Sequence, residues 1–571
     1  MRLSGAEILA RVLIEQGVDT VFGYPGGSVL PIYDALYDHR DTITHYITAH
    51  EQGATHAADG YARSTGKVGV VLATSGPGST NIVTGIATAF MDSIPLIAIT
   101  GNVGTSYIGK DSFQEVYTTG ITLPITKHNF SVQNVEELAQ RLREAFAIAT
   151  TGRKGPVLID ITKDAQAAWC EWEPTLESDP LRLKQPSQFT QADIDAVLSH
   201  ISASKKPLVL FGGGVILANA SRKLSDFIHA SRIPAAHSMM GIGAMDTNDP
   251  LNIGLVGMHG RLSANRAIAE ADLILSLGFR FSDRVVLSAD HWASKAYLIQ
   301  VDIDHSEIDK NIEVDQAIVG DIDEVLCALL DKLGFRSDDR VMAAPDTGVW
   351  LAQIDEWRAS DFRPQNDDTT LKPHQIMETI SEIAGNDAIL VTDVGQHQMW
   401  AAQYCRRTRP RSFISSGGLG AMGFGYGAAI GAQIGAAGAS GRTHPVIHIT
   451  GDGSFHMNLN EACTAVSYHL PIITVILNNH VLGMVRQWQK SFYDAHYYAS
   501  TLDRVTDFVK LAKGFGLTGM RTTTIAEFKD ALSQALSING PVWIECVIDR
   551  DEQVIPMIPS GGTVEDVIDD L

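Results

Sequence analysis

The stretch that decides the fold is residues 445–489, PVIHITGDGSFHMNLNEACTAVSYHLPIITVILNNHVLGMVRQWQ. An apolar run over 446–450 stops at Gly451-Asp452-Gly453, and a second run over 472–477 ends in Asn478-Asn479. The helical pattern between the two runs is typical of a parallel β-α-β unit. Because the carboxyl ends of parallel strands meet at one edge of a sheet, we expect Asp452 and Asn479 to lie close together.

Those two side chains have the chemistry of a metal site. A carboxylate oxygen and an amide oxygen suit a hard cation, and a glycine turn leaves room for phosphate oxygens. Mg²⁺ prefers a few protein oxygens and shares its other positions with substrate phosphates or water. The stretch therefore predicts a metal–diphosphate site, although a plain G-D-G turn followed by an unrelated Asn pair would give the same letters.

Length and composition limit the classes of protein. The chain has 571 residues, enough for about three to four domains of roughly 150 residues each. It is 45% hydrophobic and 19% charged, which is typical of globular proteins. The net charge of −22 argues against nucleic acid and anionic membranes as partners. No apolar run reaches the length of about 20 residues that spans a bilayer.

The ends and the cysteines indicate a compartment. Residues 1–17 read as an amphipathic helix without the apolar core or cleavage site of a signal peptide. The five cysteines are scattered, odd in number and contain no CxxC pair. We expect reduced thiols in a cytoplasmic protein.

Alternating strand and helix patterns continue along the rest of the chain. We expect an α/β protein of three doubly wound parallel-sheet domains. The predicted domains are residues 1–170, 190–335 and 371–550, and a tail over 551–571 is expected to cover the active site. Polar stretches over 171–191 and 336–368 are the predicted linkers.

Two distant segments share one plan of G-x-G-S turn, helix, proline and strand. They are GPGSTNIVTGIATAFMDSIPLIAIT, residues 76–100, and GDGSFHMNLNEACTAVSYHLPIITVIL, residues 451–477. This internal sequence repeat suggests that the first and last domains are structurally related, although βα units also recur by chance.

The middle block contains a weaker motif. A strand over 207–211 runs into Gly212-Gly213-Gly214, which suits a dinucleotide phosphate but lacks the full G-x-G-x-x-G spacing. A plain tight turn explains it nearly as well.

Further motifs fall in one order along the chain. They are GYPGGS (23–28), HEQGATHAADGYAR (50–63), TSGPGSTN (74–81), DSFQE (111–115), GRKGPVLIDITKD (152–164), GMHG (257–260), RFSDR (280–284), VGQHQMW (394–400), SGGLGAMG (416–423) and GMVRQWQ (483–489). With the GDG and NN pairs, they make the chain resemble the large, catalytic subunits of acetolactate synthase (acetohydroxyacid synthase), a family of thiamin-diphosphate-dependent enzymes. The first few motifs are shared more widely among thiamin-diphosphate enzymes, and RFSDR and GMVRQWQ are the two that narrow the resemblance to this family.

The resemblance implies an activity and three cofactors. Pyruvate would be decarboxylated on thiamin diphosphate, and the two-carbon unit transferred to a second 2-ketoacid. The product is 2-acetolactate from pyruvate or 2-aceto-2-hydroxybutyrate from 2-ketobutyrate, in the biosynthesis of branched-chain amino acids. The cofactors would be thiamin diphosphate, Mg²⁺ and FAD, and the flavin would be structural because the reaction has no net redox change.

The resemblance also assigns residues. The catalytic residues would be Glu51, Gly27, Gln114 and Lys163, and the substrate contacts Phe113, Arg284, Met484 and Trp488. Thiamin diphosphate would contact Pro77, Asn81, Gly395, Gln396, His397, Gly420, Met422, Gly451, Gly453 and Ser454. The metal would bind Asp452, Asn479 and the backbone of Val481. FAD would contact Arg153, Gly212, Gly213, Gly214, His259, Gly278, Arg280, Asp302 and Asp321.

Three of these residues have plainer readings without the resemblance. Glu51 could be a helix-N-terminal carboxylate stabilised by the helix dipole. Arg284 could pair with Asp283, and Trp488 could be a core residue. In the family, Glu51 and Asp452 meet across a subunit boundary, which implies a homodimer or homotetramer; a small regulatory subunit is a further possible partner.

Two other functions compete with this reading. A flavin-using pyruvate oxidase, or another thiamin-diphosphate 2-ketoacid decarboxylase, would share most of the motifs. A catalytically dead scaffold is the third possibility, which the presence of Glu51, Asp452 and Asn479 makes improbable.

Overall fold

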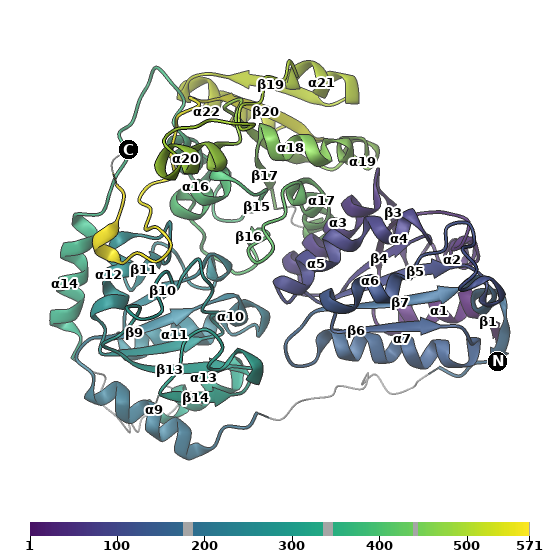
Figure 1. Ribbon diagram of the computed structural model, residues 1–571, viewed down its shortest axis with the longest axis horizontal. Helices are drawn as coiled ribbons and strands as arrows, with labels where there is room; N and C mark the ends of the chain where they lie inside the picture. The colour runs from purple at the N-terminus through teal and green to yellow at the C-terminus, as the bar shows by residue number, and fades with distance from the viewer. Residues whose placement is uncertain (175–186, 335–345, 438–443, 570–571) are drawn as a thin grey trace.

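The computed structural model describes residues 1–174, 187–334, 346–437 and 444–569, and these form three α/β domains (Figure 1). Each domain is built on a parallel sheet with six strands in the described residues. The predicted fold class is confirmed, while the predicted domain boundaries stay predictions. Most of the predicted linker over 171–191 lies outside the described residues.

The N-terminal sheet has the strand order β3-β2-β4-β5-β7-β6. Its strands are β2 (Thr20–Tyr24), β3 (Thr44–Ile47), β4 (Gly69–Ala73), β5 (Leu96–Asn102), β6 (His128–Val132) and β7 (Pro156–Thr162). Its helices are α1 (Gly5–Glu15), α2 (Leu30–Asp38), α3 (Glu51–Thr65), α4 (Pro77–Asn81), α5 (Val83–Met91), α6 (Thr118–Thr122), α7 (Val135–Thr150) and α8 (Lys163–Ala167). A short antiparallel pair, β1 (Arg2–Ser4) with β8 (Trp169–Glu171), joins the two ends of this domain.

The C-terminal sheet has the order β16-β15-β17-β18-β20-β19. Its strands are β15 (Ile389–Thr392), β16 (Phe413–Ile414), β17 (Val446–Gly451), β18 (Ile472–Asn478), β19 (Thr518–Thr522) and β20 (Val542–Val547). Its helices are α15 (Pro373–Ala384), α16 (Gln396–Tyr404), α17 (Phe424–Ala437), α18 (Asp452–Asn458), α19 (Ala462–Ser467), α20 (Gly483–Phe492), α21 (Phe508–Phe515) and α22 (Ile525–Ala535). When the strands are numbered within their own domains, the two outer sheets have the same strand order. The structural relation suggested by the internal sequence repeat is therefore confirmed.

The middle sheet differs, with the order β11-β10-β9-β12-β13-β14. Its strands are β9 (Pro207–Phe211), β10 (Ala235–His237), β11 (Asn252–Leu255), β12 (Leu273–Leu277), β13 (Tyr297–Asp302) and β14 (Gln316–Val319). Its helices are α9 (Gln191–Ala203), α10 (Gly213–Leu217), α11 (Ser221–Ser231), α12 (Leu262–Glu270) and α13 (Ile322–Lys332). This is the order of doubly wound dinucleotide-binding folds.

The strand orders place the candidate motifs. Ligands bind open α/β sheets where the strand order reverses, beyond the carboxyl ends of the strands. In the C-terminal sheet the reversal lies between β15 and β17, which end at Thr392 and Gly451. In the middle sheet it lies between β9 and β12, which are followed by Gly212 and Gly278.

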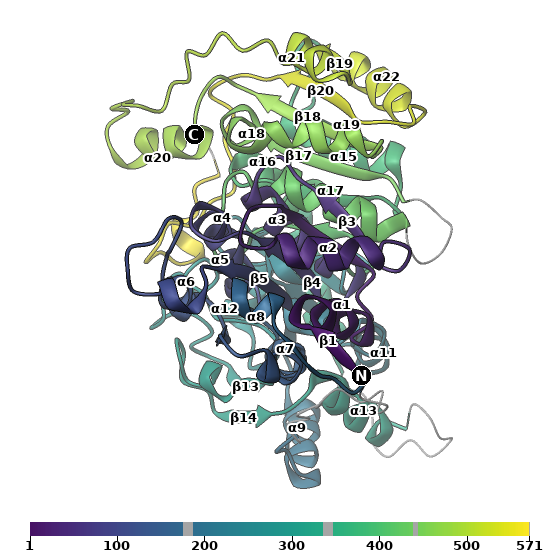
Figure 2. The same cartoon turned by 90° about the vertical axis from the view of Figure 1, so that its right-hand side faces the viewer.

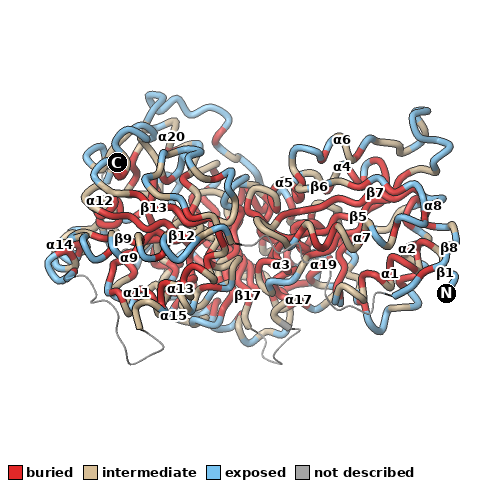
Figure 3. The backbone as a smooth tube through the Cα atoms, turned by 90° about the horizontal axis from the view of Figure 1, so that it is seen from below, coloured by how far each residue is buried: buried red, intermediate tan, exposed pale blue. Residues whose placement is uncertain are grey.

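The outer domains share one hydrophobic core, because α3 packs closely against α17. A Cβ atom at Gly60 would overlap the backbone oxygen of Ala428, and one at Gly431 would overlap that of Ala57. Small residues on both helices therefore let the two backbones approach. Figure 3 shows the buried strands and this helix pair in red.

The predicted linker over 336–368 is wrong where the structure describes it, because Gly348–Ala359 form α14. Trp350 on α14 is buried and donates a 3.1 Å hydrogen bond from Nε1 to Pro207 O, so the helix packs as part of the middle domain.

All five cysteines are described, and none forms a disulfide. None of the helices in the described residues combines the length and apolar composition needed to cross a membrane.

The tail leaves the C-terminal domain and crosses to the middle domain. Val554 O accepts a hydrogen bond from Gln487 Nε2 (3.0 Å), and Ile558 N then donates to Met258 O (2.9 Å). In Figure 1 this yellow segment runs beside α12. That the tail covers the active site stays a prediction.

Candidate functional site

A cavity of about 1830 Å³ lies where the three domains meet. Its walls come from the carboxyl ends of the C-terminal and middle sheets, and from one side of the N-terminal domain. It brings together most of the cofactor residues expected from the sequence, which are Arg153, Gly213, Gly214, His259, Gly278, Arg280, Asp302, Asp321, Gly395, Gln396, His397, Gly420, Met422, Gly451, Asp452, Gly453, Ser454, Asn479 and Val481. Gly212 lies directly before this lining, at the end of β9.

Asp452 is the centre of the candidate metal site. It begins α18, is 4% exposed, and has no ion pair with any described residue. Burial raises the pKa of its carboxyl to about 7. Asn479 follows β18 on the adjacent strand, and its Oδ1 accepts from Val481 N at 3.2 Å.

No group of three His, Cys, Asp or Glu side chains gathers into a metal cluster in the described ranges. A single carboxylate with amide and backbone oxygens fits Mg²⁺, which keeps waters and phosphates as its other ligands. A buried carboxylate without an ion pair is costly, and a divalent cation would offset that cost. The residues present therefore fit the metal.

His397 and two glycines form the floor beside Asp452. A Cβ at Gly395 would lie 2.9 Å from the His397 ring, and one at Gly451 would lie 3.0 Å from it. Gly395 has φ of +150°, a conformation that only glycine adopts easily. Burial lowers the pKa of His397 to about 4, so the ring is neutral, and its Nε2 has no partner among the described residues. The ring nitrogen without a partner and the backbone of the two glycines, which carry no side chain, fit a diphosphate.

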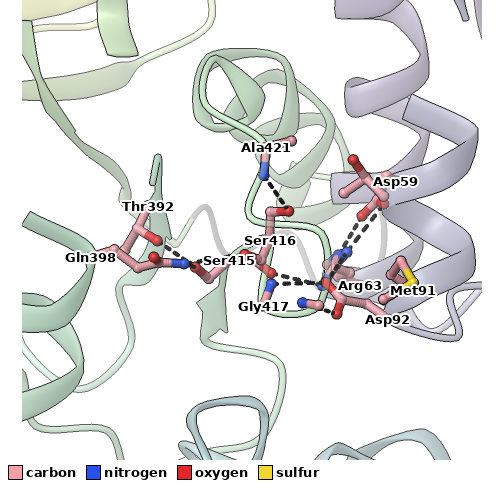
Figure 4. A network of polar contacts seen from close by, with 12 residues as sticks. Asp59, Arg63, Met91, Asp92, Thr392, Gln398, Ser415, Ser416, Gly417 and Ala421 are labelled. Atoms are coloured by element: carbon pink, nitrogen blue, oxygen red, sulfur yellow. Dashed lines mark hydrogen bonds and ion pairs between the residues drawn. The ribbon is translucent and has the colours of Figure 1, made fainter. Parts of the chain in front are cut away.

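The glycine-rich loop over 415–423 is held by a buried polar network (Figure 4). Asp92 accepts from Gly417 N (3.0 Å) and Gly418 N (2.7 Å), and Arg63 Nη2 donates to Asp92 at 3.0 Å. Arg63 also pairs with Asp59 one turn earlier on α3. The network ties the loop that carries Gly420 and Met422 to the N-terminal domain.

The candidate substrate residues of the C-terminal and middle domains line the same cavity. Trp488 and Met484 are half-buried on α20, which projects from the domain in Figure 2. The alternative of a core Trp is therefore wrong. Arg284 does lie 3.5 Å from Asp283, but both side chains are mostly exposed, at 62% and 78%, so the pair contributes little and leaves the guanidinium available.

The middle-domain end of the cavity has the expected dinucleotide features. Gly214 N donates to Gly278 O at 3.1 Å across the strand-order reversal. Asp302 ends β13, and burial raises the pKa of its carboxyl to about 6. His259 Nδ1 has no partner among the described residues. These groups fit FAD, although Arg153 is already engaged by Glu307 at 2.6 Å.

The expected catalytic, substrate and thiamin diphosphate residues of the N-terminal domain lie elsewhere. Among the described residues that line the cavity there is none of Gly27, Glu51, Pro77, Asn81, Phe113, Gln114 and Lys163. They instead gather at the carboxyl edge of their own sheet: Asn81 Nδ2 donates to Glu51 Oε2 at 2.9 Å, and Gly76 lies against Gln114. Phe113 is 88% exposed. One chain thus carries two separate halves of the expected site.

Sequence reasoning missed the residues that position these halves. Asp92 and Arg63 hold the glycine-rich loop, and Gln487 Oε1 accepts from Gln396 Nε2 at 3.0 Å. The one feature of the sequence that could have indicated this network is Arg63, which ends the HEQGATHAADGYAR motif in a helix of small residues. Their partners are distant in the sequence, so no local pattern reveals them.

Comparisons with known proteins follow this geometry. The thiamine pyrophosphate enzyme family is matched by its N-terminal TPP binding domain at residues 3–121, its central domain at 194–329 and its C-terminal TPP binding domain at 393–546. The fold and these matches place the chain in the class of thiamine pyrophosphate enzymes.

Relatives narrow the class. The chain is 41% identical to the acetolactate synthase isozyme 2 large subunit of Escherichia coli, over 100% of both chains. It is also 41% identical to the probable acetolactate synthase large subunit of Methanocaldococcus jannaschii, over 99% of this chain and 95% of the relative. A Mycobacterium bovis acetolactate synthase is 42% identical, over 99% and 91%. The chain belongs to the family of acetolactate synthase large subunits.

Proposed function

We propose that this protein decarboxylates pyruvate and transfers the two-carbon unit to a second 2-ketoacid. The products are 2-acetolactate from pyruvate and 2-aceto-2-hydroxybutyrate from 2-ketobutyrate, in the biosynthesis of valine, leucine and isoleucine. One observation carries the proposal: the buried Asp452 carboxylate opens onto the same cavity as Trp488 and Arg284. A metal–diphosphate anchor thus lies beside groups suited to select a ketoacid.

The lining of the cavity supports the cofactor contacts that the family resemblance implies. Asp452, Asn479 and the backbone oxygen of Val481 would hold Mg²⁺. The diphosphate would lie against Gly395, Gln396, His397, Gly451, Gly453 and Ser454, and the rings against Gly420 and Met422. Bound thiamin diphosphate supplies a carbon centre that adds to a ketone and accepts the electrons released with CO₂.

Glu51 would hold the proton that cofactor activation requires. Its tip is oriented by Asn81, and Pro77 lies on the same helix as Asn81. Because these residues lie outside the cavity of their own chain, a partner subunit must deliver them. We propose a homodimer, or a homotetramer built from two such dimers, in which each site combines two chains.

Substrate contacts would also come from both chains. Arg284 would grip the carboxylate of the second ketoacid with its planar fork. Trp488 and Met484 would form an apolar wall against its side chain. Gly27, Phe113, Gln114 and Lys163 would complete the site from the partner. Gly27, Phe113 and Lys163 are exposed in this chain, and Gln114 is half-buried.

FAD would bind in the middle-domain end of the cavity in a structural role. The large-subunit names of the relatives favour a small regulatory subunit. The free thiols favour the cytoplasm.

The direct test is to incubate the purified protein with pyruvate, thiamin diphosphate, Mg²⁺ and FAD, and to measure acetolactate and oxygen. We expect acetolactate without oxygen consumption. Oxygen uptake without acetolactate would support the pyruvate oxidase alternative. Absence of acetolactate, with and without a small subunit, would refute the proposal.

The shared site has its own test. Glu51→Gln and Asp452→Asn chains, each inactive alone, are co-expressed with different tags. If the two residues act in one site from different chains, mixed dimers keep one intact site, and the population regains about a quarter of wild-type activity. If both residues act within one chain, mixing restores nothing.

A further inference from the structure

The carboxylate of Glu461 connects the C-terminal domain to the start of the helix that carries Glu51. Ala49 N donates to Glu461 Oε2 and His50 N donates to Oε1, both at 3.1 Å. Each carboxylate oxygen therefore takes one of two successive backbone N–H groups. The contact joins residues that are more than 400 positions apart in the sequence.

The surroundings are shaped around this carboxylate. Glu461 is 0% exposed, and Thr464 Oγ1 donates to its Oε2 at 2.7 Å. A Cβ at Gly53 would overlap Oε1, so glycine is needed there to admit the carboxylate. No ion pair to Glu461 occurs among the described residues, and burial raises the pKa of its carboxyl. Such a group is costly to bury, and the N–H groups of the loop are what stabilise it.

The same segment grips the loop at a second point. Tyr468, just beyond α19, accepts from Ile47 N at 2.9 Å, and its ring packs edge-on against Tyr46. Residues 461–468 thus hold the chain from 46 to 50 on both sides of the turn into α3. Glu51 is the next residue and the first of α3.

We propose that Glu461 is a positioning residue for Glu51. Glu461 fixes the backbone from which the Glu51 side chain starts, while Asn81 fixes the tip of that side chain. The inference rests on the proposed role of Glu51, because positioning affects the reaction only if that carboxylate acts in it. Figure 1 shows α3 next to the C-terminal domain, from which this support comes.

Glu461→Gln tests the contact, because an amide has one acceptor oxygen and turns an NH₂ group toward the second backbone N–H. We expect kcat for acetolactate to fall on the order of tenfold to a hundredfold, as small misplacements of a reacting group do, with KM for pyruvate within about twofold. Exchange of the C2 proton of the bound cofactor, followed by NMR, should slow by the same factor. In the protein without cofactor, amide hydrogen exchange at Ala49 and His50 should rise on the order of tenfold.

Asp272 offers a matched control. It accepts from two successive backbone groups, Lys205 N (2.8 Å) and Lys206 N (2.9 Å), and from the Ser204 hydroxyl. It lies before β12, away from the cavity. Asp272→Asn should raise amide exchange at 205–206 and leave kcat and C2-proton exchange unchanged.

The outcomes separate the two proposals. If Glu461→Gln keeps wild-type kcat and C2-proton exchange while Glu51→Gln is inactive, the positioning role is overturned and the proposed function stands. If the wild-type protein forms no acetolactate, the proposed function fails, and unchanged amide exchange in Glu461→Gln would separately refute the backbone contact. Should Glu461→Gln fail to fold, Thr464→Val removes only the supporting hydroxyl. It should change kcat, C2-proton exchange and amide exchange in the same direction by a smaller factor. If all three stay at their wild-type values, the inference is overturned.

Discussion

Asn81 donates a 2.9 Å hydrogen bond from Nδ2 to Oε2 of Glu51, across the junction between α4 and α3. α3 follows β3 and α4 follows β4, and these two strands lie on either side of β2 in the N-terminal sheet. The bond therefore forms at the carboxyl edge of the sheet, where the strand order reverses between β2 and β4. Glu51 therefore has a fixed direction even though the cavity of its own chain does not contain it.

Asn81→Ala should weaken the reaction without unfolding the protein. A hydrogen bond contributes about 0.5–1.5 kcal/mol net, so loss of this orienting contact should lower kcat severalfold, up to about tenfold. Steady-state kinetics with pyruvate give the comparison. Asn248→Ala, on an exposed turn of the middle domain, should leave kcat unchanged. Equal kcat in both variants would show that Glu51 needs no support from Asn81.

Trp488→Leu should reduce discrimination between the two second substrates. A pocket wall distinguishes one methylene by about 1–3 kcal/mol, so preference for 2-ketobutyrate over pyruvate should fall roughly tenfold or more. The measurement is the ratio of the two products at mixed substrate concentrations. Phe492→Leu, which changes the neighbouring ring on α20, is the control and should alter the ratio less. An unchanged ratio in Trp488→Leu would remove this residue from the specificity site.

Gly431→Ala should destabilise the joint core of the outer domains. The added methyl would overlap the backbone oxygen of Ala57, so α3 and α17 must separate, and overpacking of this kind costs about 1–3 kcal/mol or more. Gly514→Ala is the control, since nothing lies within 4 Å of a Cβ there and alanine favours α21 by up to about 1 kcal/mol. Urea unfolding should show a lower midpoint for the first variant and an equal or higher midpoint for the second.

The sequence predicted the sheets and the metal–diphosphate motif because both follow from local rules. Apolar runs end in Gly451-Asp452-Gly453 and Asn478-Asn479, and parallel topology brings such ends together. The network of Arg63 and Asp92 could not be foreseen, because its partners come from α3, the end of α5 and the glycine-rich loop, which are far apart in the sequence. The helix α14 was missed because a charged composition hid the single buried face that carries Trp350. The separation of Glu51 from Asp452 within one chain was expected from the family resemblance alone.

Arg63→Ala should cost much more stability than its position at the end of α3 suggests. The guanidinium pairs with Asp59 and Asp92, all three side chains are at most 6% exposed, and its removal leaves two carboxylates buried without a cation. Breaking a buried pair in this way typically costs about 3–5 kcal/mol. The control is Lys67→Ala, whose partner Asp19 is half-exposed, with an expected cost below about 1 kcal/mol. Similar urea midpoints for the two variants would contradict the buried network.

Acid should weaken the fold through its buried histidines, and His237 isolates the effect. Burial lowers the pKa of His237 to about 4, from an ordinary value of 6.5. Below pH 6.5 His237 is protonated in the unfolded chain but stays neutral in the folded protein. The free energy of unfolding therefore falls as the pH drops, and the loss is complete below about pH 4. The full loss from one such group is about 3 kcal/mol.

Carboxyls oppose this trend in the same window. Burial raises the pKa of Asp160 to about 6, so its contribution to stability rises as the pH falls. The stability of the wild-type protein measured against pH therefore combines a loss from the histidine with a gain from the carboxyl. The difference in stability between wild type and His237→Asn isolates the contribution of the histidine. Asparagine keeps a donor for Ser238 O, which His237 Nδ1 reaches at 3.1 Å, and does not titrate. The stability of wild type relative to this variant should fall between pH 6.5 and 4, and a pH-independent difference in urea unfolding would show that His237 does not resist protonation.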